Sequence, residues 1–275
     1  MMRGDAERGG AMGRLDGKTA WVSGSTKGIG EGIARLFAKE GASVSILGRN
    51  DADGERVRDE IFAEGGKAIY IHCDVTLRKD VENSIEKTAE SFGGLDILIN
   101  NAGTVGVKML HEYTDEEWDY LMTLNVKSMF WAFKYAFPYL IKHEKSYVVN
   151  IGSISSFVGQ DMTPVYTASK GAVLNLSKSI GLDYARYGIR SNCICPGITE
   201  TPLLRFHMQS AGDIDEVRAN RLKRVPIARA LTAEDIARAA LYFSCEDSSG
   251  ITAASLIVDG GYIAAAEWDT TAHTR

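Results

Sequence analysis

The residues best suited to chemistry in this sequence are Ser153, Tyr166 and Lys170. Tyr166 and Lys170 stand four positions apart, so on a helix their side chains project from the same face. A free phenol has a pKa of about 10 and is a poor acid or base near neutrality. An ammonium one turn away favours the phenolate, so the spacing predicts a Tyr166 pKa lowered towards the range that suits acid–base catalysis. An ordinary helix face is the alternative for the pair on its own.

A glycine-rich loop follows the first short apolar segment, residues 19–22. Its spacing is GxxxGxG, and the helix expected after it carries Ile33, Leu36 and Phe37 on one face. In a strand–loop–helix unit, such glycines let the backbone approach a pyrophosphate at the positive end of the helix. A tight turn is the alternative. The loop residues expected to bind the phosphates are Gly24, Ser25, Thr26, Lys27, Gly28, Ile29 and Gly30.

The end of the second expected strand, residues 43–47, bears on the choice of cofactor. In dinucleotide-binding folds an acid at this point accepts the ribose 2′-OH of NAD, whereas a basic residue suits the 2′-phosphate of NADP. This chain has Gly48, Arg49 and Asn50 there, and Lys27 lies in the glycine loop. Each cation alone is compatible with a surface charge, but two near one phosphate favour NADP(H) over NAD(H).

Strand-like and helix-like segments alternate along the rest of the chain. Further strands are expected at residues 68–73, 95–99, 147–151, 190–195 and 254–258, and helices at residues 51–64, 115–140, 166–187 and 235–243. The alternation predicts one α/β domain, a Rossmann-like doubly wound parallel sheet of about seven strands with helices on both faces. The domain is expected to span residues 15–266, with tails at 1–14 and 267–275 and a mobile lid at about 199–229.

Asn125 stands in apolar company within the expected helix at 115–140, among Leu121, Leu124 and Phe130. A polar side chain in such surroundings needs hydrogen-bond partners, either for a functional task or as a plain buried bridge. Small residues and amides also follow several expected strands, and they fit the ligand crevice at the carboxyl edge of a doubly wound sheet.

In this order and spacing, the motifs resemble the short-chain dehydrogenase/reductase family, in its single-domain branch with an Asn-Ser-Tyr-Lys tetrad. The resemblance covers about residues 15–262. Ser23 stands where the family usually has Thr, and Gly152 stands where another Ser is common. The matching residues are Gly24, Gly28, Gly30, Asp74, Val75, Asn100, Asn101, Ala102, Gly103, Asn125, Ser153, Tyr166, Lys170, Pro196, Gly197 and Thr201.

The resemblance implies a role for each member of the tetrad. Tyr166 would exchange a proton with the substrate oxygen, and Ser153 would polarise and orient that oxygen by a hydrogen bond. Lys170 would lower the Tyr166 pKa and hold the nicotinamide ribose hydroxyls, and Asn125 would position a water for proton relay. The cofactor would carry the hydride. The cofactor-binding residues expected beyond the glycine loop are Arg49, Asn50, Asp74, Val75, Asn101, Ala102, Gly103, Tyr166, Lys170, Pro196, Gly197, Ile198, Thr199 and Thr201.

The function favoured by these features is an NADP(H)-dependent oxidoreductase that interconverts a secondary alcohol and a ketone. One alternative is an NAD-dependent dehydrogenase of a sugar, sugar acid, polyol or cyclic alcohol. A protein that senses nucleotides without catalysis is a remote alternative, because such a relative would be expected to lose part of the tetrad. Related enoyl reductases space Tyr and Lys more widely than Tyr166 and Lys170 are spaced.

The substrate is less defined by the sequence. The expected pocket wall comprises Thr104, Val105 and the lid, and the residues expected to contact substrate are Ser153, Gln160, Tyr166, Leu203 and His207. A solvent-facing position is favoured over substrate contact for His207. The apolar lid residues suit an aliphatic or cyclic ketone, whereas the lid cations suit a carboxylate such as a keto sugar acid or the phosphopantetheine of an acyl carrier.

Composition narrows the classes of partner. The 275 residues carry a net charge of -5, so no basic surface for nucleic acid or an anionic membrane is expected. No apolar run approaches the ~20 residues that span a bilayer, and the polar start of the chain is expected to be neither a signal nor an anchor. The family resemblance implies a homotetramer or dimer. A cytoplasmic location is expected, and no metal site is expected. The four cysteines are expected to be reduced, with Cys193 and Cys195 alternating across a strand.

Overall fold

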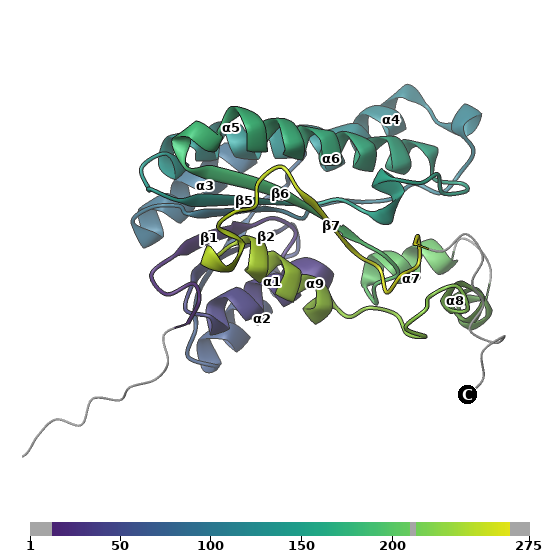
Figure 1. Ribbon diagram of the computed structural model, residues 1–275, viewed down its shortest axis with the longest axis horizontal. Coiled ribbons are helices and arrows are strands. Elements are labelled where there is room, and N and C mark those ends of the chain that lie inside the picture. The colour runs from purple at the N-terminus through teal and green to yellow at the C-terminus, as the bar shows by residue number, and fades with distance from the viewer. Residues whose placement is uncertain (1–12, 210–212, 265–275) are drawn as a thin grey trace, which may run out of the picture.

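Seven parallel strands form one sheet with helices on both faces (Figure 1). The structure is a computed structural model, and it describes residues 13–209 and 213–264. The strand order is β3-β2-β1-β4-β5-β6-β7, which confirms the doubly wound α/β prediction. The strands are β1 (Thr19–Val22), β2 (Ser43–Gly48), β3 (Lys67–His72), β4 (Ile97–Asn100), β5 (Ser146–Ile151), β6 (Ile189–Pro196) and β7 (Ser255–Val258).

The helices divide between the two faces of the sheet, and each face has its own apolar core (Figure 1). On one face Ile33 and Phe37 pack with Ala237, and on the other Val81 packs in a cluster with Met129. The first face is covered by α1 (Gly28–Lys39), α2 (Asp51–Ala63) and α9 (Ala233–Phe243), the second by α3 (Arg78–Phe92), α4 (Asp115–Met122), α5 (Ser128–Leu140) and α6 (Pro164–Asp183).

The central strands are apolar because helices cover both faces of the sheet. All residues of β1 and β5 are buried, as expected where helices cover both faces of a parallel sheet. The chain runs from β1 outwards through β2 to β3, and then returns to place β4 on the other side of β1. Carboxyl ends that diverge at such a reversal leave a crevice, which is where ligands bind in open α/β sheets.

The long helix expected at residues 115–140 is in fact interrupted. A π-helical turn, Thr123–Lys127, separates α4 from α5, and it contains Asn125. The hydrophobic pattern continues through the turn, so periodicity alone did not reveal it. Single π turns of this kind occur frequently at functional sites, because the widened backbone re-aims a side chain.

The lid expected at about 199–229 contains two helices that the weak periodicity did not predict. These are α7 (Pro202–Gln209) and α8 (Ile214–Leu222), and the Asp213 side chain caps α8 by accepting from the backbone N–H groups of Asp215 and Glu216. The expected start of α9 is confirmed: Thr232 accepts from the Asp235 N–H and forms a capping box.

The ends of the chain fall mainly outside the described residues. The predicted tails at 1–14 and 267–275 lie there, apart from Gly13 and Arg14. Arg14 is not loose, because its guanidinium pairs with Glu40 at 3.0 Å. None of the described helices is long and apolar enough to cross a membrane.

The two cysteines of β6 differ from the expectation. Residues two apart on a strand share a face, so Cys193 and Cys195 point to the same side, with their sulfurs 3.7 Å apart. All four cysteines are free and buried, and the described residues contain no cluster of three potential metal ligands.

Candidate active site

One large cavity opens at the carboxyl ends of the central strands. Its volume is about 1280 Å³, which exceeds the ~300–1,000 Å³ typical of a single small-molecule pocket. The predicted residues that line it are Gly24, Thr26, Lys27, Gly28, Ile29, Arg49, Asn50, Asp74, Val75, Asn101, Ala102, Gly103, Ser153, Gln160, Tyr166, Lys170, Pro196, Gly197, Ile198, Thr199, Thr201, Leu203 and His207. The space is large enough for a dinucleotide together with a substrate.

Two residues of the glycine loop shape it without lining the cavity. The Ser25 hydroxyl donates to the Val22 carbonyl at 2.6 Å and accepts from the Leu47 N–H at 2.9 Å. A Cβ atom at Gly30 would lie 2.3 Å from the Gly24 carbonyl oxygen, so only glycine lets α1 pack this close to the loop. Their predicted contact with a cofactor is therefore replaced by a role in holding the loop.

The first turn of α1 is open to an anion. Lys27 precedes the helix, and no side chain caps its N–H groups. Gly28 has φ +62°, a left-handed conformation that favours glycine. Free N–H groups at the positive end of a helix, facing a cavity, fit the pyrophosphate of a dinucleotide.

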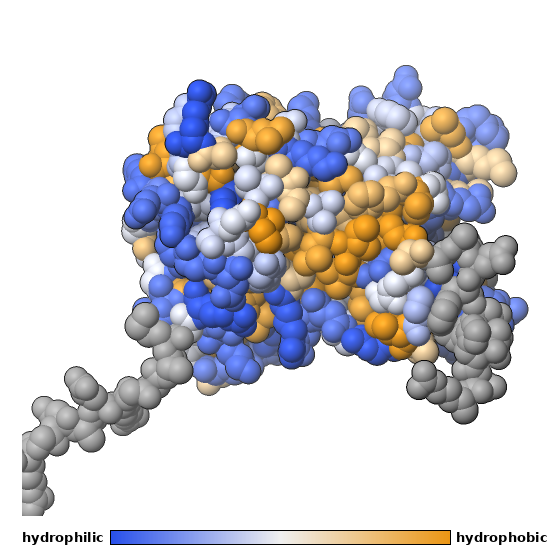
Figure 2. Space-filling view, viewed as in Figure 1, coloured by the Kyte–Doolittle hydropathy of each residue, from blue (hydrophilic) through white to orange (hydrophobic). Residues whose placement is uncertain are grey.

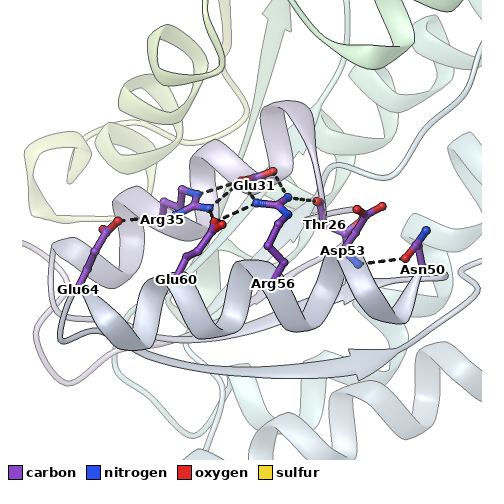
Figure 3. A network of polar contacts seen from close by, with 8 residues as sticks. All are labelled: Thr26, Glu31, Arg35, Asn50, Asp53, Arg56, Glu60 and Glu64. Atoms are coloured by element: carbon purple, nitrogen blue, oxygen red, sulfur yellow. Dashed lines mark hydrogen bonds and ion pairs between the residues drawn. The ribbon is translucent and has the colours of Figure 1, made fainter.

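A charged network holds this loop against the neighbouring helix (Figure 3). Arg56 of α2 donates to the Thr26 carbonyl at 3.2 Å and pairs with Glu31 of α1 at 3.0 Å. Glu31 also pairs with Arg35 at 2.9 Å, and Glu60 contacts both arginines. The role of Arg56 could not be predicted from the sequence, because its partners come from three separate segments.

The end of β2 has no room for an acidic side chain at Gly48, and the cation of Arg49 follows it. A Cβ atom at Gly48 would lie 2.5 Å from Thr26 Cγ2, so a larger side chain there would displace the loop. Arg49 is largely exposed, and its Nη1 lies 3.7 Å from Asp74 Oδ2 across the mouth of the cavity. The arrangement leaves the guanidinium available to a phosphate at this end of the cavity.

Ser153, Tyr166 and Lys170 come together on one wall of the cavity, as predicted. Ser153 follows β5, and its hydroxyl accepts from the Ser155 N–H at 3.1 Å. Tyr166 and Lys170 project from the first turns of α6, with Nζ 5.7 Å from the centre of the phenol ring. Lys170 Nζ also donates to the Ile151 carbonyl at 2.7 Å.

The pKa values of this pair depart from the expectation. Burial raises the pKa of Tyr166, and the hydrogen bond with Ser153 only partly opposes it. Burial also lowers the pKa of Lys170 to about 8. The predicted lowering of the Tyr166 pKa is therefore absent from the chain alone, because both groups share a site in which the charged form of each is disfavoured.

Asn125 holds a loop and does not line the cavity. Its Oδ1 accepts from the Thr104 N–H at 2.9 Å, and its Nδ2 donates to the Thr104 carbonyl and to Ser169 Oγ. A Cβ atom at Gly103 would lie 3.4 Å from both Asn125 Oδ1 and Lys170 Nζ. Asn125 thus makes the hydrogen bonds that its burial requires, and its amide lies close to Lys170 behind the cavity wall.

The thiols of β6 explain the glycine before Ser153. A Cβ atom at Gly152 would lie 2.9 Å from Cys193 Sγ and 3.0 Å from Cys195 Sγ. The space that a serine would fill at position 152 is taken by the two sulfurs behind it. The departure from the family pattern is thus a matter of packing, and the pair lies directly under the catalytic strand end.

The substrate end of the cavity contains residues that the sequence analysis did not single out. His207 is buried, whereas a solvent-facing position was favoured, and Thr104 does not line the cavity although Val105 does. In the sequence, these residues share only a position after a strand or in the lid. Such positions are too common to identify residues that line a cavity. Lining residues within the lid expected to form the wall, from Leu203 to Arg224, include Val217, Asn220, Arg221 and Arg224. Lining residues outside the expected wall include Ser155, Val158, Asp161, Met162 and Tyr262.

Known proteins resemble this chain along nearly its whole length. The model of a family described as enoyl-(acyl carrier protein) reductase matches residues 24–263. An uncharacterized oxidoreductase from Thermotoga maritima is 36% identical, over 90% of this chain and 98% of that protein. A 3-oxoacyl-[acyl-carrier-protein] reductase from Chlamydia pneumoniae is 33% identical, over 90% of this chain and 97% of that protein.

A solved structure from Beutenbergia cavernae shows the same architecture. Its description proposes an NAD(P)-dependent gluconate 5-dehydrogenase and reports NADP bound at low occupancy. The TM-score is 0.85 at 31% identity, over 91% of this chain and 98% of that one. Fold, site and sequence agree: the chain belongs to the short-chain dehydrogenase/reductase family, and it is an NAD(P)-dependent oxidoreductase that acts on CH–OH groups.

Proposed function

We propose that this protein is an NADP(H)-dependent reductase of ketones to secondary alcohols, with Tyr166 as the proton donor. The observation that carries the proposal is the meeting of Ser153, Tyr166 and Lys170 on one wall of the cavity. The four-residue spacing of Tyr166 and Lys170 favours carbonyl reduction over the enoyl reduction named in the family description, because related enoyl reductases space these residues more widely.

The residues present fit a nicotinamide dinucleotide. The uncapped first turn of α1 would hold the pyrophosphate, with Gly28 allowing close approach. Arg49 and Lys27 would pair with a 2′-phosphate, and Asp74 and Val75 would border the adenine. Ile198 and Thr201 would hold the carboxamide. When bound, the cofactor supplies the hydride that reduces the carbonyl carbon.

Ser153 and Tyr166 would act on the substrate oxygen. The Ser153 hydroxyl accepts from the Ser155 N–H and shares a hydrogen bond with Tyr166, so it would turn its proton to the carbonyl oxygen when a substrate binds. The raised pKa of Tyr166 keeps the phenol protonated. A protonated phenol is the form that gives its proton to the alkoxide that develops during reduction. The same groups acting in reverse would serve alcohol oxidation.

Lys170 and Asn125 would support that transfer. An ammonium has three N–H donors, and Lys170 uses one on the Ile151 carbonyl. Two donors are left for the hydroxyl pair of the nicotinamide ribose. The Asn125 amide lies near Lys170 across Gly103, so a water between them would connect the site to solvent. Proton relay through that water is part of the proposal.

A second function is favoured by one neighbour. The Beutenbergia cavernae structure is described as acting on gluconate, so a dehydrogenase of a sugar acid with the same proton-transfer groups is the alternative. Alternatives with NAD and a sugar, polyol or cyclic alcohol require that Arg49 make no productive contact with the cofactor.

The test uses the purified chain with NADPH and with NADH. Binding is followed by quenching of Trp fluorescence, and turnover by cofactor absorbance with a panel of ketones. We expect tighter binding of NADPH, and Arg49→Ala should weaken NADPH alone by about 10- to 100-fold, the value of a lost charge-assisted hydrogen bond. Arg58→Ala is the matched control, because Arg58 is an arginine of α2 that pairs with the next residue of that helix, Asp59.

Tyr166→Phe separates chemistry from binding in the same assay. The variant should bind NADPH as the wild type does and lose reduction by about 100-fold or more, in line with removal of a general acid. Equal affinity for the two cofactors, unchanged by Arg49→Ala, would move the assignment to NAD-linked oxidation. Normal cofactor binding with no turnover of any ketone or alcohol would favour the nucleotide-sensing alternative.

A further inference from the structure

Two arginines at the C-terminal end of α8, one in its last turn and one just after it, face the substrate end of the cavity without an acidic partner. Arg221 and Arg224 both line the cavity that contains Tyr166. Among the described residues, no carboxylate lies within the 4.0 Å of an ion pair from either guanidinium. Other lid arginines are paired: Arg218 with Glu200, and Arg229 with Asp235. Among the described residues, Arg205 and Lys223 of the lid form no ion pair either, but they do not line the cavity, so Arg221 and Arg224 are the unpaired lid cations that face it.

Arg221 is held in place by a neutral ring. Its two terminal nitrogens lie 3.5 Å from Nδ1 and 3.4 Å from Nε2 of His207. These ring nitrogens point in different directions, so one guanidinium cannot bond both in the ring plane and must lie across the ring. Burial and the charge of Arg221 lower the pKa of His207 to about 4, so near neutrality the ring adds no second charge.

The guanidinium is therefore oriented but not satisfied. Arg221 is half-buried, and the described residues give it no hydrogen bond other than those to His207. Its planar fork of N–H donors matches the two oxygens of a carboxylate. Arg224 lies at the rim of the same wall, 5.0 Å from the centre of the Tyr262 ring.

The acidic residues of the cavity are distributed unevenly. Asp51 accepts from the Tyr70 hydroxyl, and Asp74 lies beside Arg49, both at the adenosine end. Asp161 is the acid near the substrate end, and it forms no ion pair with Arg221 or Arg224. One negative charge on this wall disfavours a dianion more than a monoanion, so a carboxylate fits better than a phosphate.

We infer that the substrate carries a carboxylate, which Arg221 binds across the His207 ring while the reacting oxygen lies at Ser153 and Tyr166. The inference rests on the proposed function and adds the substrate class to it. Arg224 supplies a second, weaker attraction at the rim. A neutral ketone of the same shape lacks the group that these residues bind.

The test compares 3-oxobutanoate, 4-oxopentanoate and 5-oxohexanoate with their methyl esters. Three lengths are used because the best spacing between carboxylate and carbonyl is to be found by the assay. For at least one length, the wild type should show a kcat/KM about 10- to 100-fold higher for the acid than for the ester, the value of a charge-assisted hydrogen bond. Arg221→Gln should remove that preference by lowering kcat/KM for the acids to the level of the esters.

Two further variants test where the charge acts. Lys223→Gln removes the same charge from α8 at a residue that does not line the cavity, so the preference should persist. Asp161→Asn removes a repulsive charge, so it should maintain or increase the preference for the acids. Calorimetric titration of the complex with oxidised cofactor, using 4-oxopentanoate and its ester, should show the same preference without turnover.

Several results would overturn the inference. Esters reduced as well as acids by the wild type would show that no carboxylate is recognised, while the proposed reductase function would stand. A loss of NADPH affinity in Arg221→Gln as large as the loss on the acids would assign Arg221 to a cofactor phosphate. Absence of turnover of every acid and ester, with no binding by calorimetry, would reject the proposed function and the inference together.

Discussion

Lys170 is a charged residue kept in surroundings that disfavour its charge. It is almost fully buried, and its Nζ has one carbonyl partner, Ile151. In the proposed complex the ribose hydroxyls would be further partners, but no carboxylate of the described residues forms an ion pair with the ammonium. At the scale of one residue, the protonation of Lys170 is therefore the feature of the site most sensitive to pH.

This sensitivity predicts the alkaline limb of the pH profile. With a pKa of about 8, Lys170 is charged below that pH and becomes neutral above it. Reduction should fall as the pH rises through about 8, because the neutral amine no longer favours the developing phenolate of Tyr166. The raised pKa of Tyr166 places its own ionisation beyond this range.

The measurement is kcat/KM for ketone reduction between pH 6 and pH 10. Lys170→Arg is the control, because a guanidinium stays charged throughout and should abolish the limb even if the rate is lower. A limb that persists unchanged in Lys170→Arg would assign the ionisation to another group.

The shared helix face of Tyr166 and Lys170 could be predicted at this scale, whereas their pKa values could not. Tyr166 and Lys170 form a local pattern, so four positions of sequence define their relation. The depth at which they lie depends on β5 and β6 beneath them, and that depth reverses the direction expected for Tyr166. His207 illustrates the same limit, because its burial depends on how α7 and α8 pack.

At the scale of elements, the glycine loop depends on α2 as well as on its own glycines. Arg56 reaches from α2 to the Thr26 carbonyl and to Glu31 (Figure 3). The contact fixes the carbonyl of a residue whose neighbours are expected to hold the pyrophosphate. Loss of this support should affect every dinucleotide, since the pyrophosphate is common to NAD and NADP.

Arg56→Met should therefore weaken NADPH and NADH alike. Loss of a hydrogen bond worth about 0.5–1.5 kcal/mol corresponds to about 2- to 12-fold in each dissociation constant. The equal effect distinguishes Arg56 from Arg49, whose replacement should affect NADPH alone. Fluorescence titration of both cofactors measures it, with Arg58→Met as the control on the same helix. A change confined to NADPH would place Arg56 at the 2′-phosphate instead.

The elements themselves were predictable where hydrophobic pattern and turn chemistry agree. The class of the sheet and the start of α9 at Thr232 both follow from such local signals. The π turn around Asn125 could not be predicted, because the extra residue leaves the apolar pattern intact. The lid helices could not either, since α8 buries none of its residues fully and contributes only partly buried side chains to a small apolar cluster.

At the scale of the whole molecule, one edge of the sheet is uncovered. β7 pairs only with β6, and Leu256 and Ile257 are 36% and 40% exposed. Figure 2 shows an apolar area on this face around β7. An exposed apolar edge strand is unfavourable in an isolated chain, so a further copy of the protein is expected to cover it.

We accordingly expect a homotetramer or dimer at micromolar concentration. Light scattering after gel filtration should report the larger mass, and Ile257→Glu should shift the protein to smaller species by placing a charge in the covered edge. Phe62→Glu is the control, because Phe62 is exposed on α2, a helix at the opposite edge of the sheet. A wild-type monomer would contradict the expectation.

The strand order also has a consequence for how the protein is made. The central strand β1 pairs with β4 through Ala20 and Ile97, which are far apart in the chain. At translation rates of about 5–20 residues per second, several seconds separate the synthesis of these two partners. During that interval an apolar strand has one edge without its partner and is free to associate with other nascent chains. A strand that is fully buried in the finished enzyme thus has an exposed edge while the ribosome is still at work.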